Sequence, residues 1–137
     1  MVDDHALFLE GVERLLSNQQ GFVVVGSCTS AAQALCLVQT QLPDIVLLDY
    51  DLGNEHGLRL LEELRRNDSL VPVLFITAGV GDSQVRRILQ LPPSGIILKH
   101  KPSELLVQAI RAILSGETWL DSKLVLPLVN QEPRNST

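Results

Sequence analysis

Apolar residues along this chain fall into two alternating patterns. Short aliphatic runs bounded by turn residues predict buried β-strands. The longer segments between them place apolar residues every three or four positions, which predicts helices with one buried face. The predicted strands cover residues 22–25, 44–48, 72–76 and 95–98, and the predicted helices cover residues 6–18, 31–40, from the loop after Asp49 to about 67, 82–91, and from Ser103 to Gly116.

Strands and helices alternate with short connections along the chain. Right-handed crossovers wind such a chain into a three-layer α/β sandwich around a parallel sheet. The first strand is short, because only Met1 and Val2 precede the acidic pair Asp3-Asp4, whereas a strand usually has about five residues. We expect that the natural chain starts upstream of Met1. In the alternative, the central strand is truncated and something else must fill its place.

Five polar residues stand where apolar runs end, namely Asp3, Asp4, Asp49, Thr77 and Lys99. The carboxyl ends of parallel strands open on one edge of the sheet, where ligands bind. We therefore expect three carboxylates, a hydroxyl and an ammonium group to meet in one crevice. This combination suits a divalent cation and a phosphoryl group.

Asp49 is the natural nucleophile of this set, because a carboxylate oxygen can attack phosphorus and form an aspartyl phosphate. Its neighbours Asp3 and Asp4 would repel an incoming phosphoryl dianion unless a cation stood between them. Mg²⁺ suits that position, since it takes a few carboxylates together with phosphate oxygens and keeps several waters.

Composition limits the remaining function classes. The chain has 137 residues, which predicts one domain, and a net charge of −5, which argues against a broad nucleic-acid-binding face. No apolar stretch reaches the ~18 residues of a membrane span, and no signal peptide opens the chain. We expect a soluble cytoplasmic domain over residues 1–121, followed by a polar C-terminal extension or linker over residues 122–137.

Several local motifs, taken together, resemble the receiver domain of two-component response regulators, and most closely the LuxR/NarL-type subfamily. The resemblance covers residues 1 to about 121. The motifs that carry it are Val2-Asp3-Asp4-His5, Leu7-Phe8, Glu10-Gly11, Pro43-Asp44-Ile45-Val46-Leu47-Leu48-Asp49, Gly95-Ile96-Ile97-Leu98-Lys99-His100 and Gly116-Glu117-Thr118-Trp119-Leu120.

The resemblance implies a flavodoxin-like fold with a five-stranded parallel sheet in the order 2-1-3-4-5 and about five helices. It also implies that Asp49 is the phosphoacceptor, that Lys99 pairs with a phosphoryl oxygen and that the Thr77 hydroxyl hydrogen-bonds another. The Mg²⁺ ligands that it implies are Asp4, Asp49, Asp3 directly or through water, and the main-chain carbonyl of Asp51.

The partners follow from the same resemblance. A sensor histidine kinase would supply the phosphoryl group, and a C-terminal helix-turn-helix DNA-binding domain, absent from these residues, would carry the transcriptional output. These residues themselves are not expected to contact nucleic acid or membrane, and a homodimer is possible. The expected role is signalling, with at most self-phosphorylation and self-dephosphorylation as enzymatic activity.

Two departures from the usual receiver pattern and one further motif keep alternatives open. The loop after Asp49 lacks the usual Pro, and Ile96 stands where an aromatic residue often reports the switch. The short first strand and Ile96 keep one alternative open, a degenerate receiver that binds partners without phosphate. A haloacid-dehalogenase-like phosphatase is another, because Asp49-Tyr50-Asp51 resembles its nucleophile motif. His5 is expected to order the loop beside the acidic pair rather than to bind a metal.

Overall fold

The computed structural model describes residues 1–52, 55–79, 86–88, 95–99 and 101–120. Its main sheet is parallel, with the strand order β1-β4-β5-β6. Each side chain of the first three of these strands is buried, as expected for parallel strands that are covered on both faces. The strands are β1 (Val46–Asp49), β4 (Val73–Thr77), β5 (Gly95–Leu98) and β6 (Trp119–Leu120).

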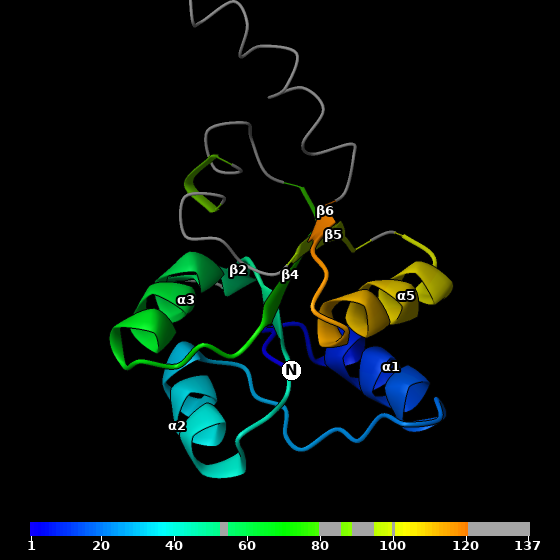
Figure 1. Ribbon diagram of the computed structural model, residues 1–137, viewed down its shortest axis with the longest axis horizontal. Coiled ribbons are helices and arrows are strands. Elements are labelled where there is room, and N and C mark those ends of the chain that lie inside the picture. The colour runs from blue at the N-terminus through cyan, green and yellow to red at the C-terminus, as the bar shows by residue number, and fades with distance from the viewer. Residues whose placement is uncertain (53–54, 80–85, 89–94, 100, 121–137) are drawn as a thin grey trace, which may run out of the picture.

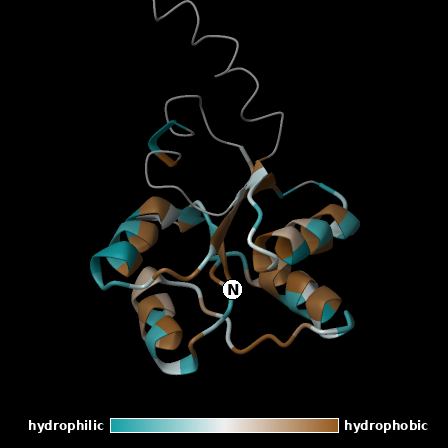
Figure 2. Cartoon of the chain, viewed as in Figure 1, coloured by the Kyte–Doolittle hydropathy of each residue, from teal (hydrophilic) through white to brown (hydrophobic). Residues whose placement is uncertain are grey.

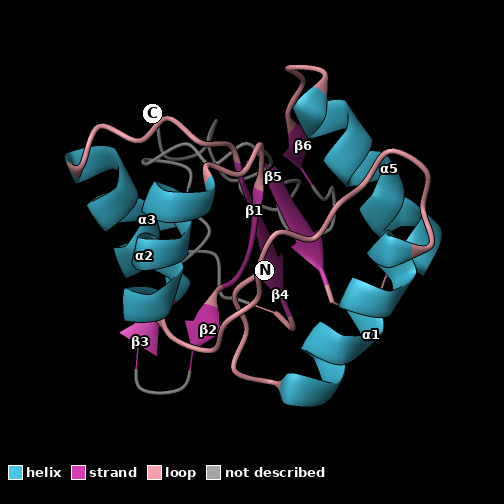
Figure 3. Cartoon of the chain, turned by 90° about the horizontal axis from the view of Figure 1, so that it is seen from below, coloured by secondary structure: helices cyan, strands magenta, loops and turns pink. Residues whose placement is uncertain are grey.

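Helices cover both faces of this sheet and make three layers (Figure 1). Helices α2 and α3 lie on one side of the strands, and α1 and α5 lie on the other, as Figure 3 also shows. The predicted flavodoxin-like sandwich is thereby confirmed. The helices span α1 (Ala6–Ser17), α2 (Ala31–Gln41), α3 (Gly57–Arg66) and α5 (Ser103–Leu114).

The core is divided between the two faces of the sheet. One cluster joins α2 and α3 to side chains such as Leu48 and Phe75, and the other joins α1 and α5 to side chains such as Leu47 and Ile97. Figure 2 shows helices with hydrophobic and hydrophilic residues on different faces, in line with the sequence periodicity. None of the helices that the structure describes has the length and apolarity of a membrane span.

The first strand is as short as the sequence indicates. Val2 forms isolated parallel bridges to Cys28 on one side and to Leu48 on the other, so Cys28, Val2 and β1 stand in the predicted order 2-1-3. The prediction of a strand at 22–25 is wrong, because these residues form no strand. Among the described residues, no strand pairs with them.

Two helix starts illustrate the role of capping. Ser30 caps α2 as predicted, because its side chain accepts a hydrogen bond from the backbone N–H of Gln33 at 3.4 Å. The prediction that Ser103 caps α5 is wrong: Pro102 occupies the cap position and Ser103 is already the first helical residue. A proline with its fixed φ is compatible with a helix start, and no side-chain hydrogen bond is made there.

The loop after Asp49 contains a short antiparallel pair. Strands β2 (Asp51–Leu52) and β3 (Glu55–His56) pair with each other directly before α3. The helix predicted over 82–91 lies largely outside the described residues; of its span, residues 86–88 are described and are helical. The extension predicted over 122–137 lies wholly outside them.

Candidate functional site

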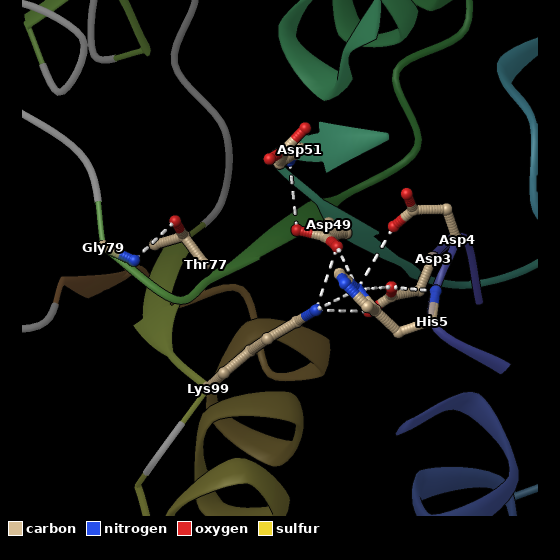
Figure 4. A network of polar contacts seen from close by, with 8 residues as sticks. All are labelled: Asp3, Asp4, His5, Asp49, Asp51, Thr77, Gly79 and Lys99. Carbon is tan, nitrogen blue, oxygen red and sulfur yellow. Dashed lines mark hydrogen bonds and ion pairs between the residues drawn. The ribbon is translucent and has the colours of Figure 1, made fainter. Parts of the chain in front are cut away.

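Three charged side chains from separate parts of the chain meet at the carboxyl edge of the sheet (Figure 4). The Lys99 Nζ atom lies 2.9 Å from Asp3 Oδ2 and 2.9 Å from Asp49 Oδ2. The side chains of Asp3 and Asp49 are 4% and 2% exposed, and that of Lys99 is 15% exposed. An ion-pair network this well buried holds its members in fixed positions.

The sheet register explains why these residues meet. Asp49 ends β1 opposite Ile76 of β4, and Thr77 ends β4 opposite Leu98 of β5, so Lys99 follows one position later. Asp3 comes directly after Val2, which bridges to the residue before Asp49. The convergence predicted from the strand ends is therefore present for Asp3, Asp49 and Lys99.

Burial and repulsion between carboxylates set the protonation of this network. Burial raises the pKa of Asp49, and the nearby Asp3 carboxylate adds to that rise, while Lys99 offsets part of it. Burial also acts to raise the pKa of Asp3, but the His5 backbone N–H and the Lys99 contact outweigh it, so the pKa of Asp3 falls below its ordinary value. Burial acts to lower the pKa of Lys99, but both carboxylates outweigh it and raise this pKa.

His5 lies closer to the acidic cluster than the sequence indicates. Its backbone N–H donates to Asp3 Oδ1 at 2.8 Å, which orders the loop as predicted. In addition, its Nδ1 atom lies 2.9 Å from Asp3 Oδ1, 3.1 Å from Asp4 Oδ1 and 3.6 Å from Asp49 Oδ2. The hydrogen bond with Asp3 raises the pKa of His5. Lys99 Nζ also lies 3.1 Å from the same Nδ1 atom, and its charge offsets part of this rise.

The same cluster fits a divalent cation. One potential ligand atom from each of Asp3, Asp4, His5 and Asp49 lies within 4.8 Å of the others. Asp3 Oδ2 is buried, and the Lys99 ammonium at 2.9 Å is its charged partner. One ammonium group faces the carboxylates of both Asp3 and Asp49, so this cluster keeps an excess of negative charge that suits a cation. An oxygen-rich donor set of this kind favours Mg²⁺ over softer metals.

Thr77 and Asp51 lie at the edge of this cluster. Thr77 is 3% exposed, and its hydroxyl accepts a hydrogen bond from the Gly79 N–H at 3.1 Å. In Figure 4 this hydroxyl points toward Gly79 rather than toward Asp49. The Asp51 backbone N–H donates to Asp49 Oδ1 at 3.1 Å, so Asp51 helps to fix the acidic side chain.

Two further residues support the site in ways that sequence reasoning missed. The backbone N–H of Gly57 donates to the Tyr50 carbonyl at 2.6 Å, and a Cβ atom at Gly57 would collide with the Asp49 carbonyl oxygen. Only glycine therefore lets α3 begin so close to Asp49. Phe8 of α1 lies under Lys99, with Nζ 4.6 Å from the ring centroid, a cation–π contact. In the sequence, these contacts could have been suspected from Gly57 as the second glycine of the loop after Asp49, and from Phe8 as an aromatic residue near the acidic pair.

A parallel α/β sandwich with an acidic cluster and a lysine at the carboxyl edge of its sheet defines a class of phosphoryl-accepting signalling domains. The comparison with family models agrees, since the response regulator receiver domain matches residues 1–111. The chain belongs to the response regulator receiver domain family.

Relatives with known sequences or structures are regulators of this family. The chain is 28% identical to the transcriptional regulatory protein DegU of Brevibacillus brevis, covering 98% of this chain and 57% of that protein. It is 31% identical to the oxygen regulatory protein NreC of Staphylococcus aureus (strain JH9), covering 99% of this chain and 63% of that protein. The chain thus spans about 60% of the length of these relatives.

Solved structures resemble it along nearly their whole length. The crystal structure of a LuxR-family two-component response regulator from Aurantimonas sp. SI85-9A1 has a TM-score of 0.88 and 29% identity, covering 96% of this chain and 94% of that chain. The signal receiver domain of the putative response regulator NarL from Mycobacterium tuberculosis has a TM-score of 0.79 and 34% identity, with 85% and 94% covered. The predicted LuxR/NarL-type resemblance is confirmed.

Proposed function

We propose that Asp49 accepts a phosphoryl group from a phosphohistidine of a sensor histidine kinase. The observation that carries this proposal is the position of the Asp49 carboxylate, buried at the strand end and held by Lys99 at 2.9 Å. In the transfer, a carboxylate oxygen of Asp49 forms a bond to phosphorus while the bond from phosphorus to the histidine nitrogen breaks. The bonding electron pair leaves with the imidazole, which takes up a proton from solvent.

The residues around Asp49 have separate roles in this proposal. Asp3, Asp4 and Asp49 would hold Mg²⁺, with the Asp51 main-chain carbonyl as a further oxygen ligand. Bound there, Mg²⁺ would neutralise carboxylate charge and attract phosphoryl oxygens. Lys99 would pair with one phosphoryl oxygen, since its ammonium group already lies against the acceptor carboxylate.

Thr77 would respond to the charge of a phosphoryl group on Asp49. Its hydroxyl now accepts a hydrogen bond from Gly79, so contact with a phosphoryl oxygen on Asp49 requires that this side chain reorient. Such a movement would alter the loop after β4 and bias the surface formed by the following segments toward an active state. Ile96, which is fully buried in β5, offers no aromatic side chain for a coupled rotation.

The proposal extends to the whole protein through its relatives. The receiver would cover residues 1–121, and residues 122–137 would lead to a helix-turn-helix DNA-binding domain that controls transcription. The protein would be located in the cytoplasm and would be able to form homodimers. The further domain is supported by the share of each relative that the chain covers, and the transcriptional output by the description of DegU as a transcriptional regulatory protein. The role proposed for this chain is signalling rather than catalysis of a metabolic reaction.

A degenerate receiver that needs no phosphate is the second candidate function. Ile96 in place of an aromatic residue favours it. Titration with Mg²⁺ and beryllofluoride, followed by backbone amide chemical shifts, distinguishes the two. With Mg²⁺ present, we expect beryllofluoride-dependent shifts at Asp49, Thr77 and Lys99 for a phosphoacceptor, with none in Asp49→Asn. Shifts in neither protein would favour the degenerate receiver.

A further inference from the structure

The side chain of His5 brings a nitrogen atom into the acidic cluster. Its Nδ1 atom lies 2.9 Å from Asp3 Oδ1, 3.1 Å from Asp4 Oδ1 and 3.6 Å from Asp49 Oδ2. Figure 4 shows the imidazole among these carboxylates, with the Lys99 ammonium beside it. The cluster therefore offers one nitrogen donor together with its carboxylate oxygens, which an all-oxygen magnesium site does not need.

The ligand atoms of this cluster already surround a cation. Atoms that carry lone pairs repel one another at such distances unless a proton or another cation lies between them. The Lys99 ammonium supplies part of this positive charge, because its Nζ atom lies 3.1 Å from His5 Nδ1. The same Nζ atom lies 2.9 Å from Asp3 Oδ2 and 2.9 Å from Asp49 Oδ2. A metal ion in the cluster would take the place of this ammonium group beside Nδ1.

The spacing of the ligand atoms matches the coordination distances of zinc. A zinc ion lies about 2.0–2.2 Å from histidine nitrogen and carboxylate oxygen, so neighbouring ligands of a tetrahedral site are about 3.4 Å apart. The distances from His5 Nδ1 to the three carboxylate oxygens, from 2.9 to 3.6 Å, lie on both sides of this value. One ligand atom from each of the four residues lies within 4.8 Å of the others. Small side-chain movements would therefore bring the imidazole and the carboxylates onto one ion.

The nitrogen donor changes which metal the cluster prefers. Carboxylate and water ligands suit Mg²⁺, whereas imidazole nitrogen suits zinc and its neighbours among the transition metals. An imidazole adds little to Mg²⁺ binding, since Mg²⁺ takes oxygen ligands. The same three carboxylates can therefore serve either ion, and His5 selects for zinc.

The backbone holds His5 where its ring reaches the carboxylates. The His5 N–H donates to Asp3 Oδ1 at 2.8 Å, and its carbonyl accepts from the Leu9 N–H at 3.0 Å in the first turn of α1. The side chain of His5 is 62% exposed, while Asp3 and Asp49 are buried. A cation can thus reach Nδ1 from solvent and enter the cluster beside it.

We propose that His5 makes the acidic cluster a zinc site, in which His5 Nδ1 and one oxygen from each of Asp3, Asp4 and Asp49 hold Zn²⁺ in tetrahedral geometry. A tetrahedral ion with four protein ligands has no open position for a phosphoryl oxygen, and it engages the Asp49 carboxylate itself. Zinc would therefore inhibit phosphoryl transfer to Asp49. This consequence rests on the proposed role of Asp49 as phosphoacceptor, whereas zinc binding itself does not.

Zinc affinity is measured by competition with a chromophoric chelator, in a Cys36→Ser background that removes an exposed thiol. We expect one Zn²⁺ per chain. His5→Asn replaces the nitrogen donor by an oxygen donor, so the ratio of Zn²⁺ affinity to Mg²⁺ affinity should fall by about 100-fold, given that even outer-shell partners of metal ligands are worth about 10- to 100-fold. His56→Asn and His100→Asn are the matched controls and should leave the ratio unchanged.

The nitrogen resonances of the imidazole identify the ligand atom. In long-range ¹H–¹⁵N spectra of the whole chain, we expect the His5 Nδ1 signal to shift on saturation with Zn²⁺, and to shift more than the Nε2 signal. A merely structural role of His5 in the loop would not single out Nδ1. The proposal is overturned by an unmoved Nδ1 signal at saturating Zn²⁺, by an affinity ratio that His5→Asn does not lower, or by an equal fall in the His56 and His100 variants.

A second measurement tests the inhibition separately from the binding. The chain is incubated with acetyl phosphate, a fixed concentration of Mg²⁺ and increasing buffered Zn²⁺, and the phosphorylated fraction is measured by intact mass. We expect this fraction to fall as the zinc site fills, and His5→Asn to need about 100-fold more Zn²⁺ for the same relative fall. Phosphorylation that persists with Zn²⁺ bound would overturn the four-ligand site. Absence of phosphorylation before any Zn²⁺ is added would instead contradict the proposed function of Asp49.

Discussion

The Nζ atom of Lys99 lies 2.9 Å from Oδ2 of Asp49, although fifty positions separate the two residues in the chain. Asp49 ends β1 and Lys99 directly follows β5, and these two strands do not pair with each other, because β4 lies between them. The contact bridges β4 at the carboxyl edge, where Asp3 joins it from the first strand. Stability and function are therefore coupled at one buried network.

Replacing the acceptor should stabilise the protein in the absence of metal. Asp49→Asn removes one of two buried carboxylates that share Lys99, so we expect the free energy of unfolding at pH 7 to rise by about 1 kcal/mol in EDTA. Urea denaturation measures it. An Asp51→Asn control, at an exposed position, should change stability little.

The gain from Asp49→Asn should depend on pH. Since the pKa of Asp49 is raised in the folded state, the folded protein binds more protons than the unfolded chain between the ordinary and the raised pKa. The wild-type free energy of unfolding therefore falls as pH rises through that window. The difference in free energy of unfolding between Asp49→Asn and wild type should be largest at pH values above the raised pKa of Asp49 and vanish below its ordinary pKa. A difference that grows toward acid pH would contradict a raised pKa for Asp49.

Removing the lysine should have the opposite effect on stability. Lys99→Met leaves Asp3 and Asp49 buried without their cation, which should cost about 3 kcal/mol at pH 7. The loss should shrink toward acid pH, where both carboxylates become protonated. Arg14→Met is the matched control, because the exposed pair of Arg14 with Glu10 is worth no more than about 0.5 kcal/mol. Equal losses in the two variants would show that the buried network contributes little.

Gly57 should be far less tolerant of substitution than a glycine in open space. Gly57→Ala directs a methyl group at the Asp49 carbonyl and at Leu48 and Phe75, so we expect a loss of about 2 kcal/mol. Gly11→Ala meets no atom within 4 Å in α1 and should instead gain about 0.5 kcal/mol from helix propensity. Thermal unfolding of both variants provides the comparison, and a neutral Gly57→Ala would contradict the close approach of α3.

Magnesium should stabilise the folded chain by binding the acidic cluster. We expect the unfolding midpoint to rise with Mg²⁺ concentration, as for any ligand that binds only the folded state. Asp4→Asn should reduce the rise because it removes one potential ligand, whereas Asp44→Asn, at a position before β1, should keep it. A rise that is equal in both variants would indicate metal binding elsewhere.

The convergence of Asp3, Asp49 and Lys99 could be predicted because it depends only on strand order and on where each apolar run ends. Residues 22–25 have the composition of a strand, but a strand exists only where a neighbour bonds to it, and no described strand pairs with these residues. Local sequence cannot report that missing partner. In the same way, Ser103 is a favoured cap residue, but Pro102 begins the helix one position earlier.

Side-chain contacts between distant elements were also beyond prediction. The position of Phe8 under Lys99 depends on how α1 is rotated against β5, which periodicity fixes only to within a face. The contact of His5 with three carboxylates depends on the turn between Val2 and α1. Strand order alone therefore does not predict which side chains surround Lys99 and Asp49.

Phosphorylation of Asp49 is tested most directly by intact mass after incubation with acetyl phosphate and Mg²⁺. We expect the wild-type chain to gain the mass of one phosphoryl group only when Mg²⁺ is present, and Asp51→Asn to gain it as well. Asp49→Asn should gain none. A phosphorylated Asp49→Asn, or a wild-type chain that stays unmodified while it binds Mg²⁺, would contradict the assignment of Asp49 as the phosphoacceptor.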